Sequence, residues 1–398
     1  MAFMGKKREK IKEQQLQGFK YFKAISGMLE SLHEVGCQRD RAGNRQLHMD
    51  QYMSLLLLYM FNPICTSLRA VQQASELKKV QRKLGCPRAS LGSLSESARV
   101  FDSTFMRDLI EQLSDKLKPI SRHSKLDDLP GILTAVDGTV IPALSKMTWA
   151  LWKTDRPAVK AHTQFDLEKH VPVRITVTHG NGGEIETLEN ELEAGRIYVQ
   201  DRGYASLALF QKILDAQSSF VCRLRDNAIY EVLEDYPLTP DAREAGIVFD
   251  RKVRLGSPGK TREQLSVPIH LVAIRCTPHV KRAKTGRGGP EQGQTLLIAT
   301  DRFDLEADVI ALIFKHRWMI EIFFRFFKHV LGCRHLLSSC QNGIELQTCA
   351  AIIACMLIAL WTGRKPTLRT YEMLCWYFTG MADEEELLAH IARLQKQD

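Results

Sequence analysis

The residue pattern changes near position 129, and this change constrains the fold more than any other feature of the sequence. From Lys6 to about Lys118 the apolar residues recur at helical spacing, and no segment there has the composition of a strand. The segment that follows, "LPGILTAVDGTVIPAL", is rich in Val, Ile and Thr and is bounded by Gly and Pro, as strands are. The sequence therefore predicts an all-helical N-terminal domain followed by an α/β region.

Further strand patterns follow the first one. They are, in chain order, "VPVRITVTHGNGG", "GRIYVQDRGYAS", "SSFVCRLRDN", "GIVFDRKVRLG", "QLSVPIHLVAIRC" and "TLLIATDRF". A basic, Gly-rich loop, "KRAKTGRGGPEQG", separates the last two. A helix with a broad apolar face is expected from Lys315 to Gly332. The order is thus a set of strands, a β-rich insertion, and then one more strand and a helix.

The composition is that of a soluble globular protein with two or three domains, because 44% of the 398 residues are hydrophobic and 25% are charged. The net charge of +9 favours a polyanionic partner, although a membrane surface would also fit it. The N-terminus has no secretory signal pattern. The longest apolar stretch, Cys349 to Trp361, is too short to span a bilayer and predicts a buried helix. We therefore expect a cytoplasmic protein without a membrane partner.

The ten cysteines include no Cys-x-x-Cys pair, so buried and reduced thiols are expected. One cluster of metal-binding residue types offers a zinc site as the alternative. It consists of His329, Cys333, His335 and Cys340. Its spacing matches no zinc motif that we can name.

The N-terminal helical region carries basic residues that would suit a DNA-binding surface, with an ordinary solvated surface as the alternative. These residues are Lys6, Lys7, Arg8, Arg69, Lys78, Lys79, Arg82 and Lys83. In the same region, "SLSESARVF" predicts a helix start at which Ser93 and Glu96 form a capping box.

Three carboxylates stand out in the α/β region. Asp137 lies inside the first strand, where an acid is costly unless it is paired or binds metal. Asp201 ends a strand just before Gly203, and Glu321 lies on the late helix. A turn-forming role is the alternative for both aspartates. Carboxylates on strand ends and a nearby helix can hold two Mg²⁺ ions about 4 Å apart, which predicts nuclease or strand-transfer chemistry.

The late helix aligns three charged residues in one stripe beside its apolar face. Arg317, Glu321 and Lys328 fall on this stripe because helical side chains that are four or seven positions apart lie one above the other. A solvated edge with an intrahelical ion pair is the alternative, but Arg before Glu is the weaker order for such a pair.

Three segments, "VDGTVIPAL", "YVQDRGYAS" and "RWMIEIFFRFFK", resemble the catalytic segments of bacterial insertion-sequence transposases, which have a ribonuclease H-like core and an Asp, Asp, Glu triad. The late helix is similar to the signature Tyr-x2-Arg-x3-Glu-x6-Lys of one subgroup, with Phe314 in place of the Tyr. The gap between Asp201 and Glu321 leaves room for the β-rich insertion of that subgroup. The resemblance covers residues from about 129 to 361.

The resemblance implies that Asp137, Asp201 and Glu321 are the catalytic residues and hold two Mg²⁺ or Mn²⁺ ions. It also implies roles in phosphate binding, which we assign to a set of DNA-binding residues. The set comprises Arg317, Lys328, Arg202 and Lys160.

Members of the family also use a Trp in the insertion to hold a flipped base. No Trp lies between Trp152 and Trp318. Tyr230 or Tyr236 is the candidate for that role, with an ordinary surface aromatic as the alternative.

The implied fold is a ribonuclease H-like mixed α/β sheet with flanking helices, interrupted by a β-rich insertion and preceded by an all-helical domain. The expected boundaries are 1–128 for the helical DNA-binding domain, 129–225 for the first part of the catalytic core, 226–294 for the insertion, 295–365 for the second part of the core, and 366–398 for a helical tail.

The implied function is DNA transposition, in which DNA is nicked at the element's ends and the released 3′-hydroxyl attacks target DNA. The expected partners are the element's terminal inverted repeats, target DNA and a second copy in a homodimer on DNA. Such a bacterial protein would associate with the nucleoid through DNA. The alternatives are a ribonuclease H-like nuclease that only hydrolyses DNA and a catalytically inactive DNA-binding derivative.

Overall fold

The computed structural model describes residues 27, 29–35, 39–40, 43–120, 124–126, 129–143, 147–152, 156–259, 262–275 and 295–395. The chain divides into two compact units, each of which is described by itself. Ser121–Arg325 forms the first, which we call the sheet unit. Met1–Ile120 and Phe326–Asp398 together form the second, which we call the helical unit. The sequence predicts boundaries after residues 128, 225, 294 and 365, whereas these two units divide after residues 120 and 325.

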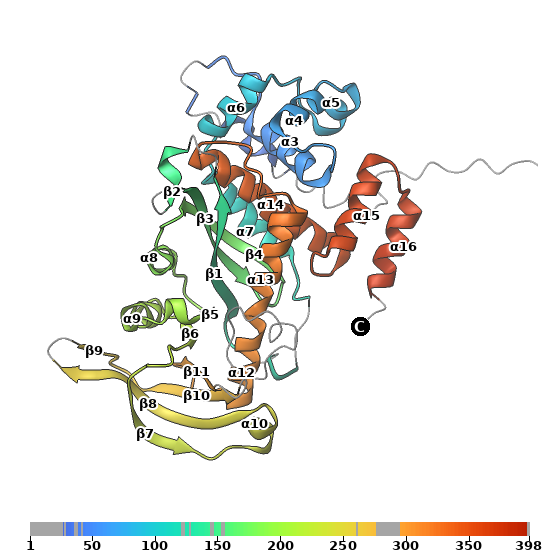
Figure 1. Ribbon diagram of the computed structural model, residues 1–398. Coiled ribbons are helices and arrows are strands. Elements are labelled where there is room, and N and C mark those ends of the chain that lie inside the picture. Colours follow the sequence, from blue (N-terminus) through green and yellow to red (C-terminus); the bar gives the residue numbers. More distant parts are fainter. Residues whose placement is uncertain are drawn as a thin grey trace, which may run out of the picture. The chain divides into compact units, whose positions relative to one another are not determined.

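A mixed sheet dominates the sheet unit (Figure 1). In the described residues it has 11 strands in the order β2-β3-β1-β5-β6-β11-β10-β8-β7, with β4 beside β3 and β9 beside β8. The strands are β1 (Ile132–Pro142), β2 (Leu151–Trp152), β3 (Arg156–Asp166), β4 (Val171–His179), β5 (Arg196–Gln200), β6 (Ser219–Arg223), β7 (Tyr230–Tyr236), β8 (Ile247–Gly259), β9 (Arg262–Gln264), β10 (Ile269–Arg275) and β11 (Thr295–Thr300). The fold is therefore of the mixed α/β class, as the sequence predicts.

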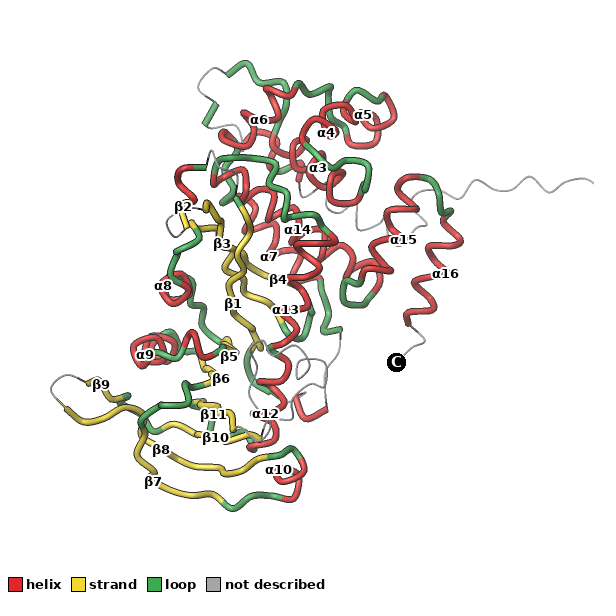
Figure 2. The backbone as a smooth tube through the Cα atoms, in the orientation of Figure 1, coloured by secondary structure: helices red, strands yellow, loops and turns green. Residues whose placement is uncertain are grey.

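The strand directions divide this sheet into three parts. Strands β4, β3 and β1 are antiparallel neighbours, whereas β1, β5 and β6 are parallel neighbours. From β6 onward, β11, β10, β8 and β7 are again antiparallel. Figure 2 shows this last, strand-rich part beside the parallel strands.

Helices cover both faces of the parallel strands (Figure 1). The helices of the sheet unit are α8 (Glu184–Glu189), α9 (Leu207–Asp215), α10 (Pro240–Glu244), α12 (Ala307–His316) and α13 (Trp318–Arg325), with 3₁₀ turns η2 (Ser124–Leu126), η3 (Thr148–Ala150) and η4 (Arg202–Tyr204). Helices α8 and α9 lie on one side, while α12 packs on β5 and β6 and α13 packs on β1. Parallel strands covered in this way are buried on both faces, which explains their continuous apolar runs.

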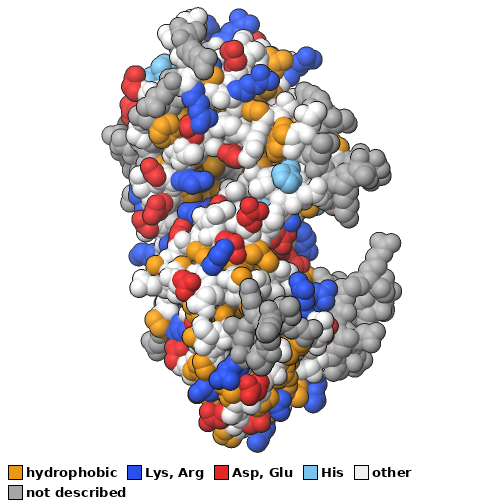
Figure 3. Space-filling model, turned by 90° about the vertical axis from the view of Figure 1, so that its left-hand side faces the viewer, with side chains coloured by type: hydrophobic (Ala, Val, Ile, Leu, Met, Phe, Trp, Pro, Cys, Tyr) orange, Lys and Arg blue, Asp and Glu red, His pale blue; other side chains and the backbone are white. Residues whose placement is uncertain are grey.

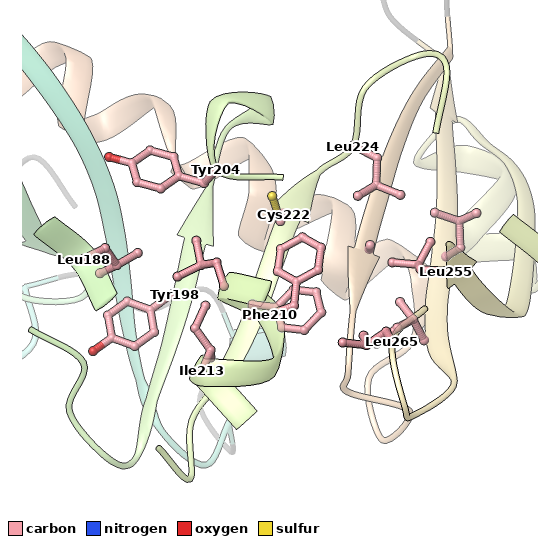
Figure 4. Close-up of a cluster of buried hydrophobic side chains, with 14 of the residues drawn as sticks. Leu188, Tyr198, Tyr204, Phe210, Ile213, Cys222, Leu224, Leu255 and Leu265 are labelled. Atoms are coloured by element: carbon pink, nitrogen blue, oxygen red, sulfur yellow. The ribbon is translucent and has the colours of Figure 1, made fainter. Parts of the chain in front are cut away.

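A cluster of buried side chains joins α8 and α9 to the sheet (Figure 4). Tyr198 of β5 and Cys222 of β6 belong to it, together with Leu188 of α8. The rings of Phe210 and Phe220 stack with centroids 4.1 Å apart. This packing fixes the ends of β5 and β6 relative to α8.

The described residues of the helical unit form helices and turns only (Figure 2). The helices are α2 (Leu32–Val35), α3 (Met49–Phe61), α4 (Leu68–Ser75), α5 (Lys78–Leu84), α6 (Leu91–Val100), α7 (Phe105–Lys116), the π-helical turn η5 (Phe326–Val330), α14 (Gln341–Thr362), α15 (Leu368–Thr379) and α16 (Glu384–Gln395). Helix α14 packs against α3, α6 and α7 and forms the centre of this unit.

Helix α14 is longer than the apolar stretch in the sequence suggests. With 22 residues it is the one helix of the described chain that is long and apolar enough to cross a membrane. Its most apolar window is 89% buried within the protein, as the central helix of a folded unit would be. The prediction of a buried helix is confirmed, whereas the estimate of its length was too short.

Several local predictions need correction. Strands β3 and β7 have no counterpart among the predicted strands, because His162, Thr163, Gln164 and the acidic residues of β7 weaken the apolar pattern. Helix α6 begins at Leu91, and Ser90 caps it by accepting a hydrogen bond from the backbone N–H of Ser93. Ser93 is therefore inside the helix and is not its cap.

The helix expected from Lys315 to Gly332 is in fact three pieces. Helix α12 ends at His316, α13 follows from Trp318 to Arg325, and η5 continues as a π-helical turn. The uniform helical spacing on which the charged stripe was based therefore does not continue to Lys328.

Candidate active site

Asp137 occupies the middle of β1, and its side chain is 25% exposed. Its Oδ1 atom accepts a hydrogen bond of 2.8 Å from the backbone N–H of Gly138. Burial raises the pKa of this carboxyl to about 6, against the lowering effect of Arg317 and of the Gly138 N–H. The nearby carboxylates of Glu184 and Glu321 raise the pKa further. Asp137 is thus a strand residue in a crowded acidic environment, and the alternative of an Asp-Gly turn is wrong.

Asp201 follows directly after β5, at the start of the 3₁₀ turn η4. The parallel register pairs Ala135 of β1 with Val199 of β5. Asp137 lies two residues beyond Ala135 and Asp201 lies two residues beyond Val199, so both aspartates follow this last pair of the register. The guanidinium of Arg223 lies 4.0 Å from Oδ1 of Asp201.

Arg317 connects two of the predicted catalytic residues. Its Nη2 donates a 3.0 Å hydrogen bond to Oε1 of Glu321, and its Nη1 lies 3.7 Å from Oδ2 of Asp137. The side chain of Arg317 is only 11% exposed, so these contacts are shielded from water. Arg317 comes from the junction of α12 and α13, and the packing of α13 on β1 brings it to Asp137.

Tyr204 ties the remaining members of the site together. It is 3% exposed, and burial raises its pKa well above the usual value. The carboxylates of Glu184, Asp137 and Asp201 raise that pKa further, and Arg317 lowers it. The charges of these residues, which come from β1, α8, η4 and the junction of α12 and α13, therefore all act on one buried phenol.

Glu184 is the member of this cluster that the sequence analysis missed. It is the first residue of α8, and its Oε1 atom lies 2.7 Å from Nζ of Lys160 on β3. The segment around it, "GNGGEIETLEN", carries no signal beyond a turn and a short polar helix. Only the fold brings this residue next to Gly138 of β1.

Metal binding can be tested on the donor groups present. The oxygen donors of Asp137, Asp201 and Glu321 have the chemistry that Mg²⁺ and Mn²⁺ prefer. In this arrangement, however, no three His, Cys, Asp or Glu side chains of the described residues lie close enough together to hold one ion. The guanidinium of Arg317 lies between Asp137 and Glu321 instead. The three carboxylates therefore fit a divalent ion by their chemistry.

A sequence model of the family described as "Transposase DDE domain" matches residues 129–357, more than half of the chain. The chain belongs to the DDE transposase family. The resemblance of the three catalytic segments to such enzymes is thereby confirmed.

Two curated relatives and one solved structure are similar to this transposase. It is 25% identical over 276 residues to "Probable transposase for insertion sequence element IS5377" of Geobacillus stearothermophilus. The aligned residues cover 69% of this chain and 68% of the relative. It is 27% identical over 231 residues to "Putative transposase y4zB" of Sinorhizobium fredii, with 58% and 60% covered, so it spans less than two thirds of that relative. A solved structure of the piggyBac transposase synaptic complex with hairpin DNA matches 94% of this chain and 78% of its own at 11% identity, with a TM-score of 0.39.

The residues of the transposase that were predicted to bind DNA have different surroundings. Arg317 and Lys160 are both paired with carboxylates, whereas Arg202 is exposed on η4. Lys328 lies in η5 of the helical unit, where it is half-buried and burial lowers its pKa. Arg317 and Lys160 would have to leave their carboxylate partners to bind DNA, whereas Arg202 is already exposed.

Only some residues of the predicted basic surface belong to the part of the chain that the structure describes. Arg69 on α4 and Lys78, Lys79 and Arg82 on α5 are exposed. Lys6, Lys7, Arg8, the side chain of Lys83 and the basic loop of residues 281–293 lie outside the described residues. On the face shown in Figure 3, Lys and Arg side chains are interspersed with Asp and Glu side chains.

The possible zinc cluster is not formed, since none of the described residues group in a way that could hold a metal ion. Cys333 is buried, and Sγ of Cys340 lies 3.2 Å from Oγ of Ser338 and 3.3 Å from the carbonyl oxygen of Ala98. These two cysteines are therefore packed thiols and not zinc ligands.

The two candidate tyrosines of the insertion lie at opposite ends of β7. Tyr230 packs against the buried cluster of the sheet, and Tyr236 meets the ring of His270 edge-on with centroids 5.9 Å apart. Their role toward a flipped base stays a prediction.

Proposed function

We propose that this transposase cleaves DNA at the ends of an insertion sequence and joins those ends to target DNA. The observation that carries the proposal is the meeting of Asp137 and Glu321 on the guanidinium of Arg317, with Asp201 directly after the strand that pairs with β1. Acids from two strands and a helix, next to a shielded arginine, suit a phosphodiester better than a neutral or cationic substrate.

The proposed scaffold is a ribonuclease H-like core. The strand order β4-β3-β1-β5-β6, antiparallel and then parallel, with helices on both faces, supports this assignment. The proposed core comprises residues 129–225 and 295–365. Strands β7 to β10 lie within the proposed insertion of residues 226–294. The helices before residue 128 are proposed to bind DNA, and residues 366–398 to form a tail.

Asp137, Asp201 and Glu321 would hold two Mg²⁺ or Mn²⁺ ions. When bound, such ions supply an activated water and stabilise the attacking and leaving oxygens. The chain's own part is to hold the carboxylates at fixed positions on β1, β5 and α13. The raised pKa of Asp137 fits this role, because a divalent cation would offset the crowding of negative charge around it.

The proposed reaction has two displacements at phosphorus. In the first, water attacks a phosphodiester at the element's end and expels the 3′-oxygen, which leaves as a 3′-hydroxyl. In the second, that hydroxyl attacks a target phosphodiester and expels the target's 3′-oxygen. Arg317 would hold the scissile phosphate, and Lys160 and Arg202 would hold neighbouring phosphates. Lys328 of the helical unit is also proposed to bind DNA. We place the reaction in a homodimer on DNA, in the bacterial cytoplasm.

The experiment supplies labelled terminal inverted repeats, target DNA and Mg²⁺ to the purified chain, and separates nicked from joined products. Both products are expected, and Asp137→Asn should form neither. Nicked DNA without joined DNA would favour a nuclease that only hydrolyses. DNA binding without either product would favour the inactive derivative.

A further inference from the structure

Thr163 of β3 carries a buried hydroxyl group that packing alone does not explain. The residue is 2% exposed, and its Oγ1 atom has no hydrogen-bond partner among the described residues. A buried hydroxyl without a partner is costly, and a valine would have nearly the same shape without that cost. The chain thus retains a group that destabilises the fold, as proteins do at functional sites.

The register of the sheet places Thr163 on the same face as Asp137. The two residues are directly opposite each other in the antiparallel pair of β3 and β1. Side chains at such positions share a face, with Cβ atoms about 5 Å apart. Phe165 lies on this face as well, because it is two residues further along β3. Its ring meets that of Phe323 on α13 with centroids 5.5 Å apart, so this is the face that α13 covers.

Among its nearest neighbours in the sheet on this face, Thr163 has one polar residue, which is Asp137. Ala161 and Phe165 lie two positions before and after it along β3, and both are apolar. Ile175 is opposite Thr163 on β4 and is apolar too. The hydroxyl of Thr163 therefore lies between three apolar side chains and one carboxylate.

The carboxylate of Asp137 has an oxygen atom that could accept this hydroxyl. Its Oδ1 atom accepts a hydrogen bond from the backbone N–H of Gly138. Its Oδ2 atom lies 3.7 Å from Nη1 of Arg317, which is an ion-pair distance and too long for a hydrogen bond. A donor without an acceptor thus lies across from an acceptor that has no hydrogen bond among the described residues.

We infer that Thr163 is a positioning residue for Asp137, and that its hydroxyl donates to Oδ2 when Arg317 leaves this carboxylate for a DNA phosphate. The inference rests on the proposed function. Rotation of the two short side chains between their staggered positions suffices, because their Cβ atoms are already cross-strand neighbours. The carboxylate would then stay oriented, with Oδ1 held by the Gly138 N–H and Oδ2 held by Thr163.

The first test measures cleavage of element ends by the full chain and its melting temperature. Thr163→Val should lower the cleavage rate by about tenfold or more, as loss of a group that orients a metal ligand does. Its melting temperature should stay or rise, because no hydrogen bond is lost. Thr163→Ser keeps the hydroxyl and should retain most of the cleavage, although loss of a buried methyl group should lower its melting temperature. Cleavage would thus follow the hydroxyl, and stability would follow the methyl group.

Thr134→Val is the matched control. Thr134 is a fully buried threonine of β1, and its hydroxyl accepts a 3.0 Å hydrogen bond from Nη1 of Arg196. Its loss should lower the melting temperature and leave cleavage unchanged, which is the reverse of the pattern expected for Thr163→Val.

The second test needs neither DNA nor metal. Arg317→Met removes the guanidinium that lies next to Asp137, so the hydroxyl of Thr163 should become a partner of this carboxylate in the free protein. Thr163→Val should then lower the melting temperature in the Arg317→Met background, but not in the otherwise wild-type chain. Full cleavage by Thr163→Val, or the same change in melting temperature in both backgrounds, would overturn the inference and leave the proposed function standing. Absence of cleavage by the wild-type chain would count against the proposed function, and the melting temperatures would still decide whether Thr163 binds Asp137.

Discussion

Helix α14 and strand β1 each run through the middle of their own unit, but their side chains meet different partners. Leu357 and Ile353 of α14 are fully buried, and α14 packs against α3, α6 and α7. Asp137 of β1 is mostly buried as well, yet it lies beside Arg317, Glu184 and Glu321. Burial stabilises the first region through apolar area removed from water. In the second it acts against the charged form, so that region is retained at a cost in stability, which is typical of active sites.

The largest expected effect is on catalysis. Asp137→Ala, Asp201→Ala or Glu321→Ala should each reduce cleavage of element ends by about 10³-fold or more, because a bound metal contributes several kcal/mol to the transition state. End binding should persist, since these acids are proposed to hold metal and not DNA. A gel assay with labelled ends and a binding titration separate the two effects.

Asp226→Ala is the matched control for these three variants. Asp226 is an aspartate of the same unit with a side chain that is 69% exposed. The Asp226→Ala variant should cleave element ends as the wild type does. Normal cleavage in any of the three other variants would remove that residue from the triad.

The next effect is on the stability of α14. Leu357→Ala should lower the free energy of unfolding by about 2–5 kcal/mol, because it removes buried methyl groups and leaves a cavity. Leu368→Ala, at a position that is 51% exposed, should change it by no more than about 0.5 kcal/mol. Thermal and denaturant unfolding measure both. Equal effects would show that α14 is not the centre of a packed core.

A substitution in β1 is expected to change the free energy of unfolding in the opposite direction. The pKa of Asp137 is raised from 3.8 to about 6, so between these pH values the folded protein binds more protons than the unfolded one. Stability must then fall as the pH rises through this window. Asp137→Asn should therefore be more stable than the wild type at pH 7, by up to about 3 kcal/mol, and the difference should vanish near pH 4.

Denaturant titrations of both proteins at pH 4 and pH 7 measure this difference. His162, whose pKa burial lowers to about 4, opposes Asp137 in the same window but is present in both proteins. Its contribution therefore cancels in the comparison. A variant that is less stable than the wild type at pH 7 would mean that the contacts of Asp137 outweigh its burial.

The two regions also differ in how far the sequence predicts them. The apolar run of α14 identifies a buried helix by composition alone. Asp137 and Asp201 could be picked out because each interrupts or ends an apolar strand. That both follow the last residue pair of β1 and β5 depends on the pairing of these strands, which is not encoded in either strand by itself. Strand β3, which carries Lys160, lies on the other side of β1, and its sequence has no clear strand pattern.

Glu184 and the junction at Arg317 lay beyond sequence reasoning for a different reason. Glu184 belongs to a polar segment, and only the fold brings its carboxylate close to Gly138 of β1 and Gly203 of η4. The apolar spacing from Lys315 to Gly332 continues smoothly through the break at Arg317 and the π-helical turn. A change of helix winding leaves no trace in the spacing of apolar residues when both sides of the break stay buried.

The smallest expected effect concerns Phe314, where the helix signature of similar transposases has Tyr. Phe314 is half-buried on α12, and its ring centre lies 5.9 Å from Cζ of Arg317. Phe314→Tyr adds one hydroxyl near the proposed phosphate site, so it should tighten end binding by up to about tenfold, the value of one hydrogen bond. The free energy of unfolding should stay within about 0.5 kcal/mol of the wild type. Phe303→Tyr, the same change at an exposed ring elsewhere in the sheet unit, should leave end binding as it is. Equal tightening in both variants would show that the hydroxyl acts on DNA without reference to Arg317, and a loss of stability in Phe314→Tyr would place that ring with the packed core and not with the charged site.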